Sequence, residues 1–123
     1  MSFIPDFLLK KIYKKGSLRE TPQGIAFDLK NLLAPAVISG VNFIKINDQI
    51  YESIVIKIIS PEKVVSAHEI SPQNPLRFKF NQESTLLLEG AKGLQEGLNK
   101  IILEIINPDV GKVNVTLTDN VAM

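Results

Sequence analysis

His68 is the only histidine among the 123 residues, so it is the one imidazole that could act as a general acid or base or bind a metal ion. In a strand it would face the opposite side from its neighbour Glu69. A metal site or an acid–base pair would therefore need a distant carboxylate, such as Asp28, Asp48 or Asp109, to converge on His68. The sequence alone does not show such convergence, and we predict a structural or surface role for His68.

The carboxylates occur singly and mostly at turn sequences. Asp48 follows an asparagine, Asp109 follows a proline, and Asp119 precedes an asparagine. Short Asp and Asn side chains bond to nearby backbone amides in turns, which explains these positions without a catalytic pair of the kind glycosidases use. We expect no catalytic residue and no metal ligand.

A glycine-rich stretch, Gly90–Gly97, could suggest a phosphate-binding loop. It matches neither G-x-G-x-x-G nor G-x-x-x-x-G-K-[ST], and the residues from Ile101 onward have the pattern of a strand rather than a helix. No G-x-S-x-G nucleophile motif occurs either. We therefore predict a turn at this stretch and no bound cofactor.

The composition limits the classes of partner. Fourteen Lys and Arg against thirteen Asp and Glu give a net charge of +1, which provides no basic surface for nucleic acid. The absence of cysteine excludes disulfides and thiolate chemistry. No apolar run approaches the roughly 20 residues of a membrane span, and no signal peptide is apparent, so we expect a cytoplasmic protein.

The elements that would position these residues are mainly strands. Residues 1–16 carry apolar residues at helical spacing and late lysines, which predicts an N-terminal helix. Residues 17–120 predict strands, since apolar residues alternate with polar ones in several short runs separated by turn signals. We predict one domain over residues 1–123, an all-β antiparallel sandwich of immunoglobulin-like or jelly-roll-like type. The clearest alternating sets are Ile25, Phe27 and Leu29; Leu76, Phe78 and Phe80; and Val113, Val115 and Leu117.

Two isoleucine-rich runs, Ile54–Ile59 and Ile101–Ile106, are apolar on both faces. Such runs predict a second covering layer, supplied either by the N-terminal helix or by a partner subunit. Over Val41–Ile46 the alternation changes face, which predicts a β-bulge near Phe43 and Ile44.

Several segments follow one another in a family-like order: a glycine before an alternating strand, a strand ending in a polar turn, a Glu-Ile pair, and a glycine-rich turn before the penultimate strand. These segments are Gly24–Lys30, Gly40–Asp48, His68–Ile70 and Gly93–Gly97. Over residues 16–120 the chain resembles the small β subunit of bacterial C-glycoside deglycosidases and related short archaeal proteins.

That resemblance implies a β-sandwich that docks on a larger, barrel-shaped, metal-dependent subunit holding the catalytic groups. The expected role is thus a non-catalytic accessory subunit. Similar short archaeal proteins carry a hydroxymethylglutaryl-CoA reductase label, but the chain is too short for that enzyme and lacks a dinucleotide fingerprint, so we do not expect that activity.

Three functions remain open from the sequence. The first is an accessory or assembly subunit whose partner is a second copy or a larger enzyme subunit. The second is a sandwich that binds a small ligand or carbohydrate through loops at one end, although only Tyr13 and Tyr51 combine a ring with a polar tip and no Trp is present. The third is an enzyme that uses His68. The frequent Ile, Lys and Glu with no Cys also resemble thermophile usage.

Overall fold

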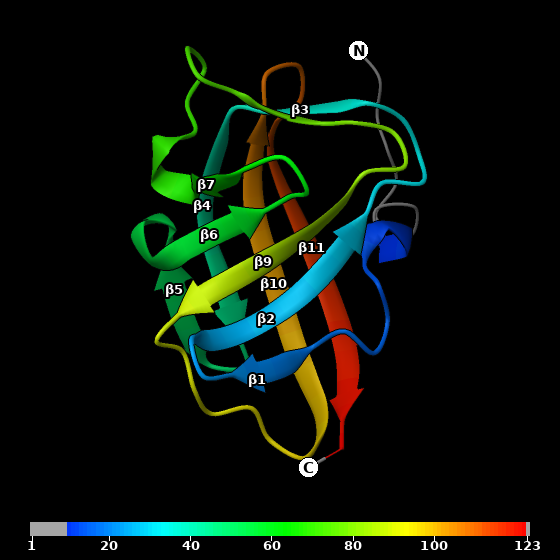
Figure 1. The fold of residues 1–123 in the computed structure, drawn as a ribbon, viewed down its shortest axis with the longest axis vertical. Coiled ribbons are helices and arrows are strands. Elements are labelled where there is room, and N and C mark those ends of the chain that lie inside the picture. The colour runs from blue at the N-terminus through cyan, green and yellow to red at the C-terminus, as the bar shows by residue number, and fades with distance from the viewer. Residues whose placement is uncertain (1–9, 123) are drawn as a thin grey trace.

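The computed structural model describes residues 10–122. They form two antiparallel sheets packed face to face, with a small two-stranded sheet at the upper end in Figure 1. The five-stranded sheet has the order β1-β2-β9-β6-β7, the four-stranded sheet has the order β11-β10-β4-β5, and β3 pairs with β8. The elements are η1 (Lys10–Ile12), β1 (Arg19–Thr21), β2 (Gly24–Lys30), β3 (Ala36–Ile38), β4 (Gly40–Ile46), β5 (Gln49–Glu52), η2 (Ser53–Val55), β6 (Ile56–Ile59), β7 (Val64–Ser66), η3 (Ala67–Glu69), β8 (Leu76–Phe78), β9 (Glu83–Glu89), β10 (Gly97–Asn107) and β11 (Gly111–Val121), where η marks a short 3-10 helix. The predicted all-β sandwich is confirmed.

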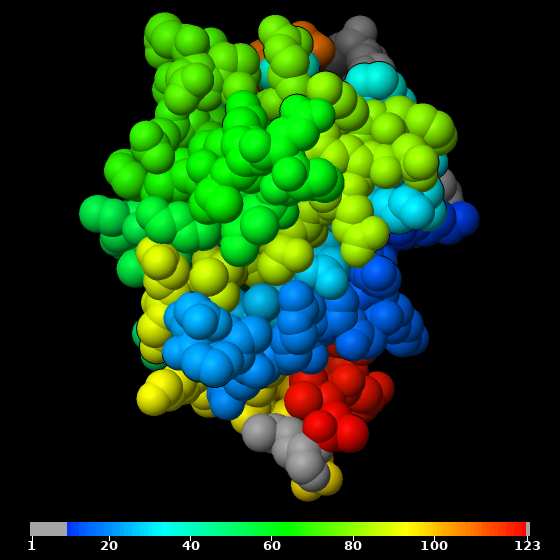
Figure 2. All heavy atoms as spheres, viewed as in Figure 1, coloured from blue at the N-terminus to red at the C-terminus, as the bar shows by residue number. Residues whose placement is uncertain are grey.

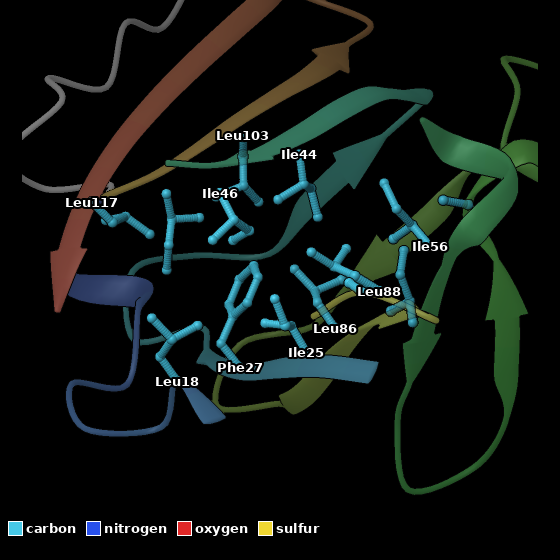
Figure 3. Packing of buried hydrophobic residues seen from close by; sticks show 14 of the residues in the cluster. Leu18, Ile25, Phe27, Ile44, Ile46, Ile56, Leu86, Leu88, Leu103 and Leu117 are labelled. Atoms are coloured by element: carbon cyan, nitrogen blue, oxygen red, sulfur yellow. The ribbon is translucent and has the colours of Figure 1, made fainter. Parts of the chain in front are cut away.

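The core lies between the two large sheets. From β2, Ile25 and Phe27 point toward the four-stranded sheet, where Ile44 and Ile46 of β4 meet them (Figure 3). All four side chains are buried, because alternate residues of each strand face the same side. Figure 2 shows the face of the five-stranded sheet, with β1 and β2 in blue below the green segments of β6 and β7.

The predicted N-terminal helix is wrong over its described part. Residues 1–9 of that prediction lie outside the described residues, and only Lys10–Ile12 forms one 3-10 turn. Directly after it, Tyr13 forms a β-bridge with Leu29, and its hydroxyl donates to the Asp119 carboxylate over 2.5 Å. These contacts with distant residues draw the chain into the sandwich, where helical periodicity no longer decides its conformation.

The two isoleucine-rich runs have different explanations. In the first, η2 precedes the strand, so Ile54 is 64% exposed whereas Ile56 is buried in the core. In the second, Ile101 of β10 is buried, and Ile102 points to the outer side of the four-stranded sheet. The second run therefore lies wholly within a strand that is apolar on both faces, whereas the first is a strand only from Ile56, with Ile59 alone on its outer face.

The expected bulge occurs one residue earlier than predicted. The register between β10 and β4 shifts between Glu104 and Ile105, so Asn42 is the extra residue on β4. The predicted alternation through Phe80 is also wrong, because β8 ends at Phe78 and a turn follows in which Asn81 has a φ of 67°. Phe80 is consequently exposed rather than part of the core.

Candidate functional site

His68 lies in η3 rather than in a strand, and its side chain is exposed. Its Nδ1 is 2.6 Å from the Ser66 hydroxyl oxygen. Asp28 lies instead on β2, where it accepts from the Thr85 hydroxyl and pairs with Arg19. Among residues 10–122, no group of three or more His, Asp and Glu side chains could hold a metal ion. The structure thus brings no carboxylate of this kind to His68.

The loops at the lower end of the sandwich in Figure 1 form an open hollow of about 460 Å³, which we call the loop-end hollow. It lies between the β4–β5 turn and the connection from β9 to β10, the two places where the sequence analysis predicted turns. Amide, carboxylate, ammonium and phenol groups line it together. The lining residues with polar side chains are Asn47, Asp48, Gln49, Tyr51, Lys92 and Gln95.

A fully buried asparagine, Asn99, fixes the floor of this hollow. Its Oδ1 accepts from Asn47 Nδ2 over 2.9 Å and from the Gln95 N–H over 3.0 Å. Its Nδ2 donates to the Gln95 carbonyl over 2.8 Å and to the Gly97 carbonyl over 3.1 Å. Asn47 in turn has a φ of 54° and accepts from the Lys100 N–H. Asn99 was not among the residues predicted from the sequence, although its position two residues before buried Ile101, on the same face of the strand, was a usable signal.

Glu20 of β1 holds the same connection from the other side. Its Oε1 accepts from the Gly93 N–H over 2.7 Å and from the Leu94 N–H over 3.0 Å. The N–H groups of Leu94 and Gly93 hold the pKa of the Glu20 carboxyl below its usual value. Burial, followed by the charge of Glu20, raises the pKa of Tyr51. Tyr51 is therefore a neutral phenol at physiological pH, suited to hydrogen bonding rather than to proton transfer.

A second hollow, of about 570 Å³, lies between the start of β1 and the end of β11, and Leu94 is among the residues that line it. Figure 2 shows the red end of β11 beside the blue residues around β1. Above this hollow, the buried Asp119 accepts from the Tyr13 hydroxyl and from the Gly16 N–H over 2.7 Å. Burial, followed by this hydrogen bond, raises the pKa of Tyr13 well above its usual value. Asp119 is not a turn residue as predicted, but an anchor for the N-terminal segment.

These groups can hydrogen-bond a polar molecule, but they do not form an acid–base pair. Every buried side-chain N or O atom of the described residues already has a hydrogen-bond partner. The interior of this end is therefore a supporting network, and only the side chains at its rim are available to a ligand.

A different surface lies on the outer side of the four-stranded sheet. In the sheet register, Ile102 lies opposite Lys45, which lies opposite Ile50. In the next row, Phe43 lies between Glu104 and Glu52. The three apolar side chains are thus diagonal neighbours, and charged residues alternate with them. We call this set the outer patch: Phe43, Lys45, Ile50, Glu52, Ile102 and Glu104.

Exposure within the outer patch rises toward the edge strand. Ile50 is 54% exposed on β5, whereas Phe43 and Ile102 are partly buried by their neighbours on the same face. Glu104 is held in place by the side-chain amide of Asn42, which donates to its Oε1 over 2.8 Å. Lys45 thus lies between the two isoleucines, and Phe43 lies between the two glutamates, so a protein that binds this surface would meet apolar and charged groups side by side.

The fold and these surfaces define an all-β sandwich domain with a loop-end hollow and an outer patch. A family model described as hydroxymethylglutaryl-CoA reductase, N-terminal domain, matches residues 8–122, and the chain belongs to this family. No curated protein matches the chain. Within the described residues, no helix is long and apolar enough to cross a membrane.

The family match corrects the expected membership in the C-glycoside deglycosidase β-subunit family. The segments behind that resemblance were strand and turn signals, which many β-sandwiches need for physical reasons alone. The matched description names one domain of an enzyme. It carries no catalytic residue over to positions of this chain.

Proposed function

We propose that this chain is a non-catalytic accessory domain or subunit, which associates with a larger enzyme chain through the outer patch. The observation that carries the proposal is the set of apolar side chains on the outer side of the four-stranded sheet, away from the core. Burying one isoleucine is worth about 1.5–3 kcal/mol, so Ile50 alone would contribute substantially to an interface.

Two further observations support this role. The family is described as the N-terminal domain of an enzyme, which agrees with a position beside a catalytic chain. The net charge of +1 offers no basic surface for nucleic acid. In this proposal the protein works in the cytoplasm.

The test uses an Ile50→Glu variant and a matched Val64→Glu control. Val64 is 63% exposed on β7, a short edge strand of the other sheet, so the control adds the same charge at comparable exposure outside the outer patch. Tagged protein is expressed in its native cells, and a co-purifying enzyme chain is then produced separately and titrated with each variant by calorimetry.

We expect Ile50→Glu to weaken this binding about tenfold, since burying the exposed half of the isoleucine is worth roughly 0.8–1.6 kcal/mol and a glutamate in the interface would also have to lose its hydration, against about 1.4 kcal/mol for a factor of ten. Val64→Glu should bind as the wild type does. Equal binding by all three proteins would show that the outer patch is not the contact surface.

The loop-end hollow favours a second candidate function, the binding of a small polar ligand such as a carbohydrate. Its mixture of amide, carboxylate and phenol groups suits hydroxyl-rich molecules. A thermal-shift screen with sugars tests it, using Asp48→Ala and the control Asp109→Ala, which lies in the β10–β11 hairpin turn at the other end. A ligand at this site should stabilise the wild type and the control but not Asp48→Ala.

A further inference from the structure

β11 is a long free edge of the four-stranded sheet. It pairs with β10 over all eleven residues, from Gly111 to Val121, and the register is continuous. At about 3.4 Å per residue this edge is about 37 Å long. The other edge strands of the two large sheets, β1, β5 and β7, have three, four and three residues. In the part of the chain that the structure describes, no strand and no loop backbone forms hydrogen bonds with the edge of β11 that faces away from β10.

The middle of this edge lacks the features by which proteins usually prevent strand pairing, such as prolines, bulges and charges, and the charged Lys112 and Asp119 lie near its two ends. β11 contains no proline, and from Val113 to Thr118 it contains no charged residue. The N-terminal segment approaches it, but Tyr13 and Gly16 bond to the carboxylate of Asp119 and not to the strand backbone. Within residues 10–122, the backbone groups along this edge of β11 therefore have no backbone partner.

We propose that β11 pairs antiparallel with β11 of a second copy of this chain about a twofold axis. Full overlap of the eleven residues is centred on Thr116, so Thr116 lies opposite its own copy. Lys112 then lies opposite Asn120, and Asn114 lies opposite Thr118. No two like charges face each other in this register, and such self-complementarity favours a second copy over a partner of other sequence.

The pairing also covers apolar surface that one copy leaves open. Val113 and Val115 lie on the core-facing side of the sheet but are only partly buried, because β11 is the edge strand and has a neighbouring strand on one side only. A neighbouring strand would cover both. The two four-stranded sheets would join into one sheet of eight strands, with both outer patches on the same side. This inference concerns a different surface from the outer patch and does not depend on the accessory role.

The test measures the mass of the full chain in solution by sedimentation equilibrium. The protein concentration runs from about 1 to about 100 µM, so that a dimer with a dissociation constant of about 1 µM would be detected. We expect about 27 kDa, twice the 13.6 kDa of one chain. Thr116→Lys places two ammonium groups opposite each other and should raise the dimer dissociation constant at least about tenfold. Thr116→Glu should do the same, and an equimolar mixture of the two variants should recover the dimer mass.

Asn114→Lys is the matched control, because it adds the same charge on the same exposed face but lies opposite Thr118 of the copy, and opposite Glu104 in its own sheet. It should remain dimeric. The proposal is overturned if the wild type stays monomeric at about 100 µM, which is about a hundred times a dimer dissociation constant of about 1 µM. It is also overturned if the lysine and glutamate variants at Thr116 fail to recover the dimer when mixed, or if Ile50→Glu alone abolishes the dimer.

Discussion

Replacing Asn99 with alanine would release the β9–β10 connection from the core. Asn99 is fully buried and makes four hydrogen bonds, to Asn47, to both backbone groups of Gln95 and to the Gly97 carbonyl. Each such bond contributes about 0.5–1.5 kcal/mol, and water entering from the adjacent hollow would restore part of the loss. We therefore expect Asn99→Ala to lower the free energy of unfolding by about 3 kcal/mol.

The expected loss corresponds to a lower melting temperature. The unfolding entropy of a chain of 123 residues is about 260 cal/mol/K at about 2.1 cal/mol/K per residue, so about 3 kcal/mol lowers the melting temperature by about 12 °C. Urea denaturation followed by circular dichroism gives the free energy, and hydrogen exchange reports the loop directly. The Gln95 amide, whose N–H donates to Asn99 Oδ1, should exchange faster in the variant.

The control is Asn114→Ala, which removes the same amide from an exposed position on β11. Its stability should stay within about 0.5 kcal/mol of the wild type. If Asn99→Ala were equally mild, the buried amide would not be what fastens the loop, and the reasoning would be refuted.

Two further predictions concern backbone space and pH. Gly24 has a φ of 147°, and a Cβ there would clash with the Leu88 carbonyl oxygen and approach the Gly90 nitrogen to 3.0 Å. Gly24→Ala should thus lower the free energy of unfolding, measured by urea denaturation, by more than about 3 kcal/mol. Gly111 has a φ of 87° and open space around it, so Gly111→Ala should lower it by only about 1–2 kcal/mol. Equal losses in the two variants would contradict this explanation. The folded-state pKa of Glu20 is below its unfolded value near 4.5, so its stabilising effect is present above pH 4.5 and is lost as pH falls through the folded pKa. Glu20→Gln should reduce the acid-side slope of stability against pH, and an unchanged slope would show that the two N–H bonds do not favour the carboxylate.

Much of the fold could be predicted because strand alternation is a local property. Ile25 and Phe27 are buried on one face, as their spacing required. The bulge could be predicted to within one residue, since an extra residue in the strand is what moves the following side chains to the other face, and the apolar residues of Val41–Ile46 change face in this way. The turns that form the loop-end hollow were also evident from Asn47 and from the glycines after β9.

The rest depended on contacts between distant residues. Residues 1–16 had helical spacing, but in the described part Tyr13 bonds to Asp119, 106 residues away, and this contact together with the bridge to Leu29 favours a bridge and a turn over a continuous helix. Ile54 belongs to a turn because the chain must cross from β5 in one sheet to β6 in the other. No local pattern contains that requirement.

The sequence by itself determined which side chains share a face of each strand, because a period of two is fixed by backbone geometry. The composition also excluded cysteine chemistry and a large excess of positive charge. Which strands are neighbours depended on the tertiary structure, and so did the position of Phe43, Ile50 and Ile102 on one outer face and the unpaired edge of β11 within residues 10–122. Strand order depends on the closure of long loops and on packing between sheets, and these energies belong to the whole chain rather than to any segment.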